Sequence, residues 1–184
     1  IIISDVMMPV MDGIEFLEKL RNDIRTSHIP VIMLTAKADM ESKLEGLVAG
    51  AEAYLTKPFD KSELKVRLKS ILDQRDILHE QYLTSILLKS MPGLNKTESA
   101  FKQQLHEILL ANLDNPKFNI DALVRQIGMS RTQLYKKVKA LTNTTVDKYI
   151  RKFRLHQSVH LLKSTDLTVS QVALEVGMPN QSYF

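Results

Sequence analysis

Three short apolar runs of the sequence are each followed by a side chain that can take part in phosphate chemistry. The runs cover residues 1–3, 31–34 and 53–56, and the side chains that follow them are Asp5, Thr35 and Lys57. If the runs are parallel strands of one α/β sheet, their carboxyl ends converge on a single crevice. A carboxylate, a hydroxyl and an ammonium group would then meet there, which is the outline of a phosphate-chemistry site.

Each of these residues also has an ordinary structural explanation. An aspartate after a strand commonly forms a turn, a threonine completes a strand, and a lysine before proline lies in a solvated loop. The flanking residues are more distinctive: SDVMMP at 4–9, DG at 12–13, PVIMLTA at 30–36, GA at 50–51 and YLTKPF at 54–59. With the spacing of the three side chains, these strings resemble the receiver domain of two-component signalling over about residues 1–72.

The receiver resemblance implies roles for four residues. Asp5 would accept a phosphoryl group from a histidine kinase, since a carboxylate is a competent nucleophile when charge is removed from the attacked phosphorus. Lys57 would neutralise the phosphoryl oxygens, and Thr35 would hydrogen-bond one of them. Tyr54 lies three residues before Lys57, at the family's aromatic switch position, where it would turn inward after a shift of Thr35. Alternatively, Tyr54 simply packs in the sheet.

The resemblance also implies Mg²⁺ as a cofactor of the complete receiver. The family holds the ion through the acceptor aspartate, the backbone carbonyl two residues later, and an acidic pair on its first strand. The first two ligands correspond to Asp5 and the Met7 carbonyl, whereas the acidic pair lies outside this sequence. Receivers order their strands 2-1-3-4-5, so strands 3, 4 and 5 are expected here. We therefore expect no enzymatic activity from these residues alone.

The elements that must position these groups alternate between strand and helix at first and are all helical afterwards. Strands are expected at 1–4, 29–34 and 53–56, with helices at 14–21, 40–48 and from 62 to about 86. Later helices are expected at 99–113, 121–127, 131–141, 146–162 and 169–176. The predicted fold is thus α/β plus all-α: a truncated flavodoxin-like receiver (1–72), a helical linker (73–98) and a double helix-turn-helix domain (99–184). The linker is either a coiled coil or a helix that folds back on the receiver.

Composition and charge narrow the function classes. The chain has 184 residues, 44% of them apolar, which suits two small globular domains. No apolar run approaches the roughly 20 residues that span a bilayer, and the absence of Cys and of a signal peptide favours the cytoplasm. An inner-membrane anchor in a longer parent chain stays open. Residues 1–113 hold 14 Lys+Arg and 16 Asp+Glu, net −2, whereas residues 114–184 hold 11 and 5, net +6. The second half is therefore the candidate polyanion binder.

A repeat in the basic half indicates how it would bind. Residues 120–129 align with residues 169–178 at an offset of 49, with apolar residues at matching positions and glycine ninth. A short helix, a turn with glycine and a second helix form the helix-turn-helix unit, and glycine accepts the positive φ that ends the first helix abruptly. Two such units joined by a long helix resemble the AraC/XylS type of DNA-binding domain. The supporting stretches are residues 128–141, 149–155 and 172–178, and the resemblance covers about residues 100–184.

The helix expected at 131–141 would be the first recognition helix. Its inward stripe consists of Leu134, Val138 and Leu141. The base-edge candidates lie near the helix start and are Thr132, Tyr135 and Lys136. The candidate phosphate contacts are Arg131, Lys137 and Lys139. Corresponding residues of the second unit are Asn180, Gln181 and Ser182. Each lysine could instead serve solvation alone.

The combined pattern predicts a phosphorylation-regulated transcription regulator. Its expected partners are double-stranded DNA, a histidine kinase as phosphoryl donor, and a second copy of the chain in a homodimer. An alternative is that the sequence is the C-terminal part of a hybrid sensor histidine kinase, a membrane enzyme with a fused receiver and DNA-binding output. A third interpretation is a pseudo-receiver that only binds partners.

Overall fold

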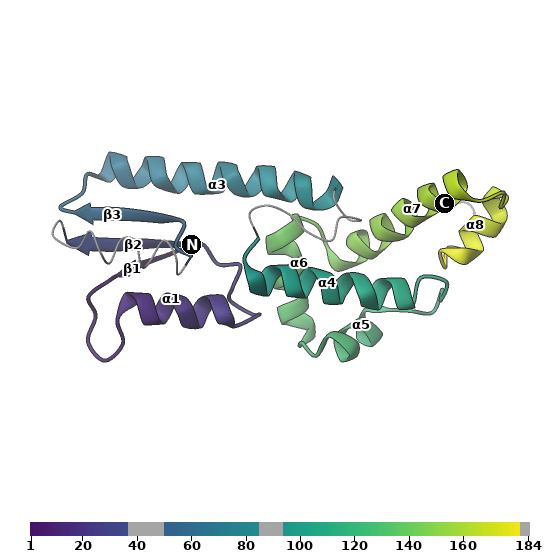
Figure 1. The fold of residues 1–184 in the computed structure, drawn as a ribbon, viewed down its shortest axis with the longest axis horizontal. Helices are drawn as coiled ribbons and strands as arrows, with labels where there is room; N and C mark the ends of the chain where they lie inside the picture. Colours follow the sequence, from purple (N-terminus) through teal and green to yellow (C-terminus); the bar gives the residue numbers. More distant parts are fainter. Residues whose placement is uncertain (37–49, 85–93, 181–184) are drawn as a thin grey trace. The chain divides into compact units, whose positions relative to one another are not determined.

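The structure, a computed structural model, describes residues 1–36, 50–84 and 94–180 and contains two compact units. The first unit comprises Ile1–Glu80 and Pro92–Ser99, and the second comprises Gln81–Met91 and Ala100–Phe184. Within the described residues, strands occur in the first unit and the second is helical (Figure 1). The predicted fold class, a parallel α/β sheet followed by an all-helical region, is confirmed. The helix predicted at 40–48 lies outside the described residues.

A three-stranded parallel sheet forms the centre of the first unit. The strands β1 (Ile2–Asp5), β2 (Val31–Ala36) and β3 (Ala53–Lys57) lie in that order. The register places Asp5 opposite Leu34 and Lys57 opposite Ala36. The sheet therefore brings the carboxyl ends of all three strands to one edge. Helices α1 (Gly13–Asn22) and α3 (Lys61–Thr84) cover opposite faces of the sheet (Figure 1).

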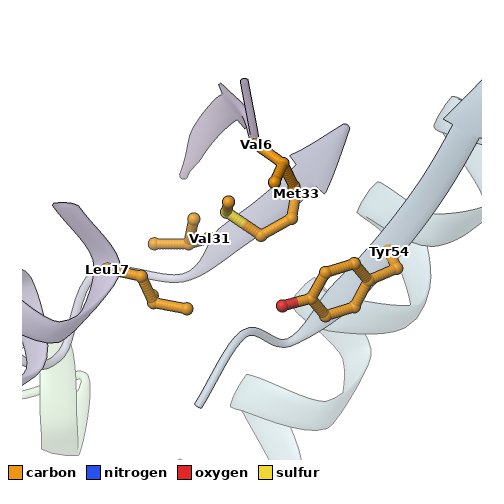
Figure 2. Packing of buried hydrophobic residues seen from close by; sticks show 5 residues of the cluster. All are labelled: Val6, Leu17, Val31, Met33 and Tyr54. Carbon is orange, nitrogen blue, oxygen red and sulfur yellow. The ribbon is translucent and has the colours of Figure 1, made fainter. Parts of the chain in front are cut away.

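Alternate side chains of β2 fill the core on both faces of the sheet. Towards α1, Val31 and Met33 join a buried cluster with Val6, Leu17 and Tyr54 (Figure 2). Towards α3, a second cluster is formed by Ile32, Ala53, Leu55 and Ile71. A strand buried on both faces needs a continuous apolar sequence, which is why the run at 31–34 shows no polar alternation.

The second unit contains five helices among the described residues. They are α4 (Lys96–Ala111), which begins in the first unit, α5 (Ile120–Ile127), α6 (Arg131–Thr142), α7 (Val146–Ser164) and α8 (Val169–Glu175). Capping boxes start α6 at Ser130 and α8 at Thr168, so both starts have their amide donors satisfied by side chains. After α5 and α8, Gly128 and Gly177 adopt φ values of 72° and 67°. The predicted glycine turns of both repeats are therefore confirmed.

The segment predicted as a linker contacts the first unit at its end. The Asn95 side-chain amide donates to the Ser27 carbonyl at 2.9 Å, and the Thr97 hydroxyl donates to the Arg21 carbonyl at 2.7 Å. The domain bounds of 1–72, 73–98 and 99–184 remain a prediction. None of the helices in the described part of the chain is both long enough and apolar enough to cross a membrane.

Candidate functional sites

The first candidate site lies at the carboxyl edge of the sheet, where Asp5 and Lys57 form an ion pair between the ends of β1 and β3. The Met7 amide also donates to Asp5 Oδ1 at 3.3 Å. The hydrogen bond from Lys57 lowers the pKa of Asp5 below its ordinary value, and the Met7 amide acts in the same direction. Both side chains stay partly exposed, so this ionised carboxylate is accessible from solvent.

Thr35 lies at the same edge of the sheet but does not engage this pair directly. Thr35 is only 2% exposed, and its hydroxyl donates to the Ala36 carbonyl at 3.2 Å. The register sets Thr35 beside Thr56 and Ala36 beside Lys57. Thr35 therefore lies one register position from the strand pair that holds Lys57. Its role towards a phosphoryl oxygen remains a prediction.

The donor set for Mg²⁺ is incomplete within the described residues. Asp5 would supply one carboxylate, and Met7, which is 75% exposed, would supply its backbone carbonyl. Such oxygen atoms are the ligands that Mg²⁺ prefers. Residues 1–36, 50–84 and 94–180 contain no group of three or more His, Asp or Glu side chains that could hold a metal ion. These residues therefore do not form a Mg²⁺ site by themselves.

Tyr54 packs inward, on the α1 side of the sheet. The residue is 8% exposed, and Figure 2 shows its ring extending from β3 into the cluster with Leu17 and Met33. Its hydroxyl finds no hydrogen-bond partner among the described residues. Burial raises the pKa of Tyr54 above its ordinary value of 10.0. The packing arrangement is observed, and a switching role remains a prediction.

Tyr54→Phe is expected to keep stability at neutral pH and to remove part of the alkaline loss of stability. Because the folded pKa is raised, the contribution of the neutral phenol is complete below the unfolded pKa of about 10 and is lost as pH rises through the folded value. Unfolding midpoints of the first unit in both proteins, followed by NMR through the methyl group of buried Met33 from neutral to strongly alkaline pH, should diverge only at the alkaline end. Parallel curves throughout that range would contradict the expectation.

The second candidate site is the outer face of α6. Arg131, Thr132, Lys136 and Lys139 are exposed, and Tyr135 is partly buried. Arg131 is held near the helix start by Asp121, 3.3 Å away, and by the ring of Tyr135, whose centroid lies 5.9 Å from the guanidinium carbon. Interactions with Tyr135 and Asp121 raise the pKa of Arg131 above its ordinary value. Lys139 Nζ donates to the Asn143 carbonyl at 3.1 Å, at the helix end.

Lys137 was predicted as a phosphate contact, and the structure contradicts this. Its exposure is 0%, and its ammonium lies 5.6 Å from the centroid of the Phe101 ring. Leu134, Val138 and Leu141 are buried on the same side. Lys137 follows Leu134 by three residues and precedes Leu141 by four, so helical geometry places it on the inner face. That spacing is the sequence signal that could have identified it.

The DNA contacts predicted for the second helix-turn-helix repeat lie only partly within the described residues. Asn180 is exposed after the α8 turn, whereas Gln181 and Ser182 lie outside the described residues. Two aspartates that flank the start of α6, Asp121 and Asp147, are not among the predicted site residues. The Tyr135 hydroxyl donates to Asp147 Oδ2 at 3.5 Å, a long contact. No sequence pattern marks these aspartates, because their partners are brought near only by the packing of α5 and α7 against α6.

Two protein families match separate parts of the chain. The family model described as "Response regulator receiver domain" matches residues 1–69, and the one described as "Helix-turn-helix domain" matches residues 123–184. These matches lie on the sheet-containing unit and on the stretch from α5 to α8. They agree with the two resemblances drawn from the sequence.

Three relatives illustrate the similarity. "Histidine kinase P4" of Formosa agariphila is 37% identical over 188 residues, which cover 100% of this chain and 14% of that protein. "Probable transcriptional regulator ycf29" of Porphyra purpurea is 32% identical over 81% of this chain and 72% of its own length. "Phosphate regulon transcriptional regulatory protein PhoB" of Pseudomonas aeruginosa is 47% identical over 39% of this chain and 31% of its own length. The chain thus spans about one seventh of the first relative.

The sheet topology, the Asp5–Lys57 pair and the two glycine turns agree with these similarities. The Porphyra purpurea relative, 32% identical, is matched over 72% of its own length, and both family models fall on the units expected for them. The chain therefore belongs to the response regulators of two-component signalling, with receiver sequence at residues 1–69 and a helix-turn-helix domain of the AraC type at residues 123–184.

Proposed function

We propose that the chain forms the regulatory and output parts of a cytoplasmic transcription regulator that accepts a phosphoryl group on Asp5 and binds double-stranded DNA. The observation that carries this proposal is the presence of a receiver and a helix-turn-helix domain in one chain. A homodimer would present four helix-turn-helix units to a symmetric operator. The receiver would thereby couple a kinase signal to DNA binding.

The chemistry proposed for the receiver is transfer of a phosphoryl group from a histidine to Asp5. A carboxylate oxygen of Asp5 would attack the phosphorus, the bond from phosphorus to the imidazole nitrogen would break, and an acyl phosphate would form. Asp5 is suited to attack, because its carboxylate is accessible from solvent and is ionised at neutral pH, as that of any aspartate with an ordinary or lowered pKa is. Lys57 already lies against this carboxylate and would remain beside the added oxygens. Mg²⁺ would supply further charge neutralisation in a complete receiver, where additional acidic ligands are needed.

The proposed DNA-binding surface is the exposed side of α6. Thr132, Tyr135 and Lys136 lie in its first two turns and would approach base edges in the major groove. Arg131 and Lys139 would contact phosphates, which supply affinity without sequence information. Lys137 has no place in this surface, because it is buried.

A second candidate function concerns the protein from which this sequence derives. The relative "Histidine kinase P4" matches this chain over its entire length and extends far beyond it. This observation favours a hybrid sensor kinase in which a kinase part phosphorylates the receiver within the same polypeptide. Autophosphorylation of the full-length protein by ATP, followed by transfer to Asp5, would support that arrangement.

The DNA proposal predicts different effects for two exposed lysines of α6. Lys136→Ala is expected to cost about 1–3 kcal/mol of binding free energy on the preferred sequence and to relax preference at one base pair. Lys139→Ala should weaken binding to all sequences alike and reduce the salt slope by about one, because it removes one phosphate contact. Affinities on a selected duplex and on random DNA, measured over a range of salt concentrations, check both expectations.

Lys137→Met serves as the matched control, since it removes a buried lysine from the same helix. It should leave the salt slope unchanged, whatever its effect on stability. Equal losses on selected and random DNA for Lys136→Ala would assign that residue to the backbone instead. Absence of salt-dependent DNA binding by the wild-type protein would reject the proposed function.

A further inference from the structure

One arginine of α7 joins three separate segments of the second unit. Arg154 Nη1 donates to the Gly177 carbonyl at 2.9 Å, and Nη2 donates to the Asn115 carbonyl at 2.7 Å. Gly177 lies in the turn after α8, and Asn115 lies between α4 and α5. The guanidinium thus connects the segment that precedes the first helix-turn-helix unit with the turn of the second.

The Gly177 turn packs closely against the segment that Arg154 reaches. A Cβ atom at Gly177 would lie 2.5 Å from the Leu113 carbonyl oxygen and 3.1 Å from the Arg154 guanidinium carbon. The turn is also fixed locally, because the Gly177 amide donates to the Leu174 carbonyl at 2.9 Å. Both the positive φ and this close approach require glycine.

The equivalent turn of the first helix-turn-helix repeat, at Gly128, has no such contact. A Cβ atom at Gly128 would meet nothing within 4 Å, although its φ of 72° is nearly that of Gly177. The two turns therefore share a backbone conformation but differ in their surroundings. The turn at Gly128 forms without an arginine beside it, so the turn conformation alone does not require the contact between Arg154 and Gly177.

We propose that Arg154 is a positioning residue. It fixes the turn of the second helix-turn-helix repeat relative to the segment that begins the first repeat, and so sets the spacing between the two half-sites that the protein binds. This inference rests on the proposed DNA-binding function. Two rigidly spaced units gain affinity when both engage one duplex, and lose that gain when geometry prevents simultaneous contact. Because the two hydrogen bonds of Arg154 fix the distance between the two helix-turn-helix repeats, the protein should gain this affinity only on duplexes whose half-sites have the matching spacing.

The first test compares Arg154→Gln with Arg151→Gln in the full-length protein. Arg151 is exposed on the same helix, one turn earlier, so its variant loses the same charge and keeps both carbonyl contacts. Duplexes selected by the wild-type protein from a random library are used with and without two inserted base pairs between half-sites. The wild type should lose about tenfold or more in affinity on insertion, and Arg151→Gln should keep that ratio.

Arg154→Gln should lose about tenfold on the selected duplex and change by less than about twofold on insertion. Arg154→Lys, which keeps the charge but can reach fewer carbonyls, should lie between the two. An Arg154→Gln protein with the wild-type insertion ratio would overturn the proposal.

The second test does not depend on DNA. Hydrogen exchange of the Gly177 and Met178 amides, which donate to Leu174 and Ala173, should be faster in Arg154→Gln while the Val172 amide inside α8 is unchanged. Unchanged exchange at the turn would also overturn the proposal. If the wild-type protein selects no duplex, the proposed function fails, and this exchange measurement alone decides whether Arg154 positions the turn.

Discussion

Asp5→Asn is expected to abolish formation of an acyl phosphate in the full-length protein. An amide lacks the anionic oxygen that attacks phosphorus, and the substitution also removes the ion pair with Lys57. Labelling with radioactive acetyl phosphate in the presence of Mg²⁺, followed by release of the label with hydroxylamine, measures the acyl phosphate directly. The wild type should carry hydroxylamine-sensitive label, and Asp5→Asn should carry none.

Asp60→Asn provides a control with the same change of charge and shape. Asp60 is exposed and accepts hydrogen bonds from the amide and hydroxyl of Ser62, at 2.8 and 2.9 Å, so its carboxylate is also ionised. It lies before α3 and is not paired with Lys57. Its label should therefore match that of the wild type. Undiminished label on Asp5→Asn would remove Asp5 as the acceptor.

The sheet and the repeated helix-turn-helix units were predictable because both depend on local sequence patterns. Short apolar runs between amphipathic helices define parallel strands, and strand order then brings Asp5 and Lys57 to one edge. A glycine followed by a capping box, as at Gly128 and Ser130, defines a turn between two helices. These signals lie within a few residues of one another, so the sequence displays them directly.

Contacts between distant segments were not predictable in this way. Lys137 was predicted as a phosphate contact; its spacing to Leu134 and Leu141 indicates the inner face of the helix, but nothing in the sequence indicates its contact with Phe101 of α4. Arg154 donates to backbone carbonyls 23 and 39 residues away, and any residue type can present a carbonyl. A single sequence contains no pattern for such partners.

Arg21 is a further example, and it ties the amino-terminal end of the sheet together. It is 8% exposed and donates to the carbonyls of Gly50 at 3.0 Å and Ile29 at 2.8 Å. It also forms an ion pair with Glu52 at 2.7 Å. The same Glu52 oxygen accepts a hydrogen bond from the Val31 amide at 2.7 Å, at the start of β2. One guanidinium therefore fixes the end of α1 against the segments that enter β2 and β3.

Arg21→Met is expected to destabilise the first unit by about 2–4 kcal/mol, because it leaves the carbonyls of Ile29 and Gly50 without this donor and removes the closer of two cationic partners of Glu52. The chain has two units and no Trp, so a global unfolding curve would mix their transitions. Hydrogen exchange of the β2 amides reports the first unit separately, and its opening free energy should fall by that amount.

Arg25→Met tests whether loss of charge alone explains the effect. Arg25 pairs with Asp23 at the surface, close to Arg21 in sequence, and such exposed pairs contribute little to stability. Its β2 amides should exchange at nearly the wild-type rate. The double substitution Arg21→Met with Glu52→Gln should recover part of the loss, since it removes the carboxylate that has lost its closer cationic partner and keeps only Arg75 at 3.4 Å. If Arg21→Met and Arg25→Met had equal effects, or if the double variant recovered nothing, the Arg21–Glu52 pair would not be what fixes this end of the sheet.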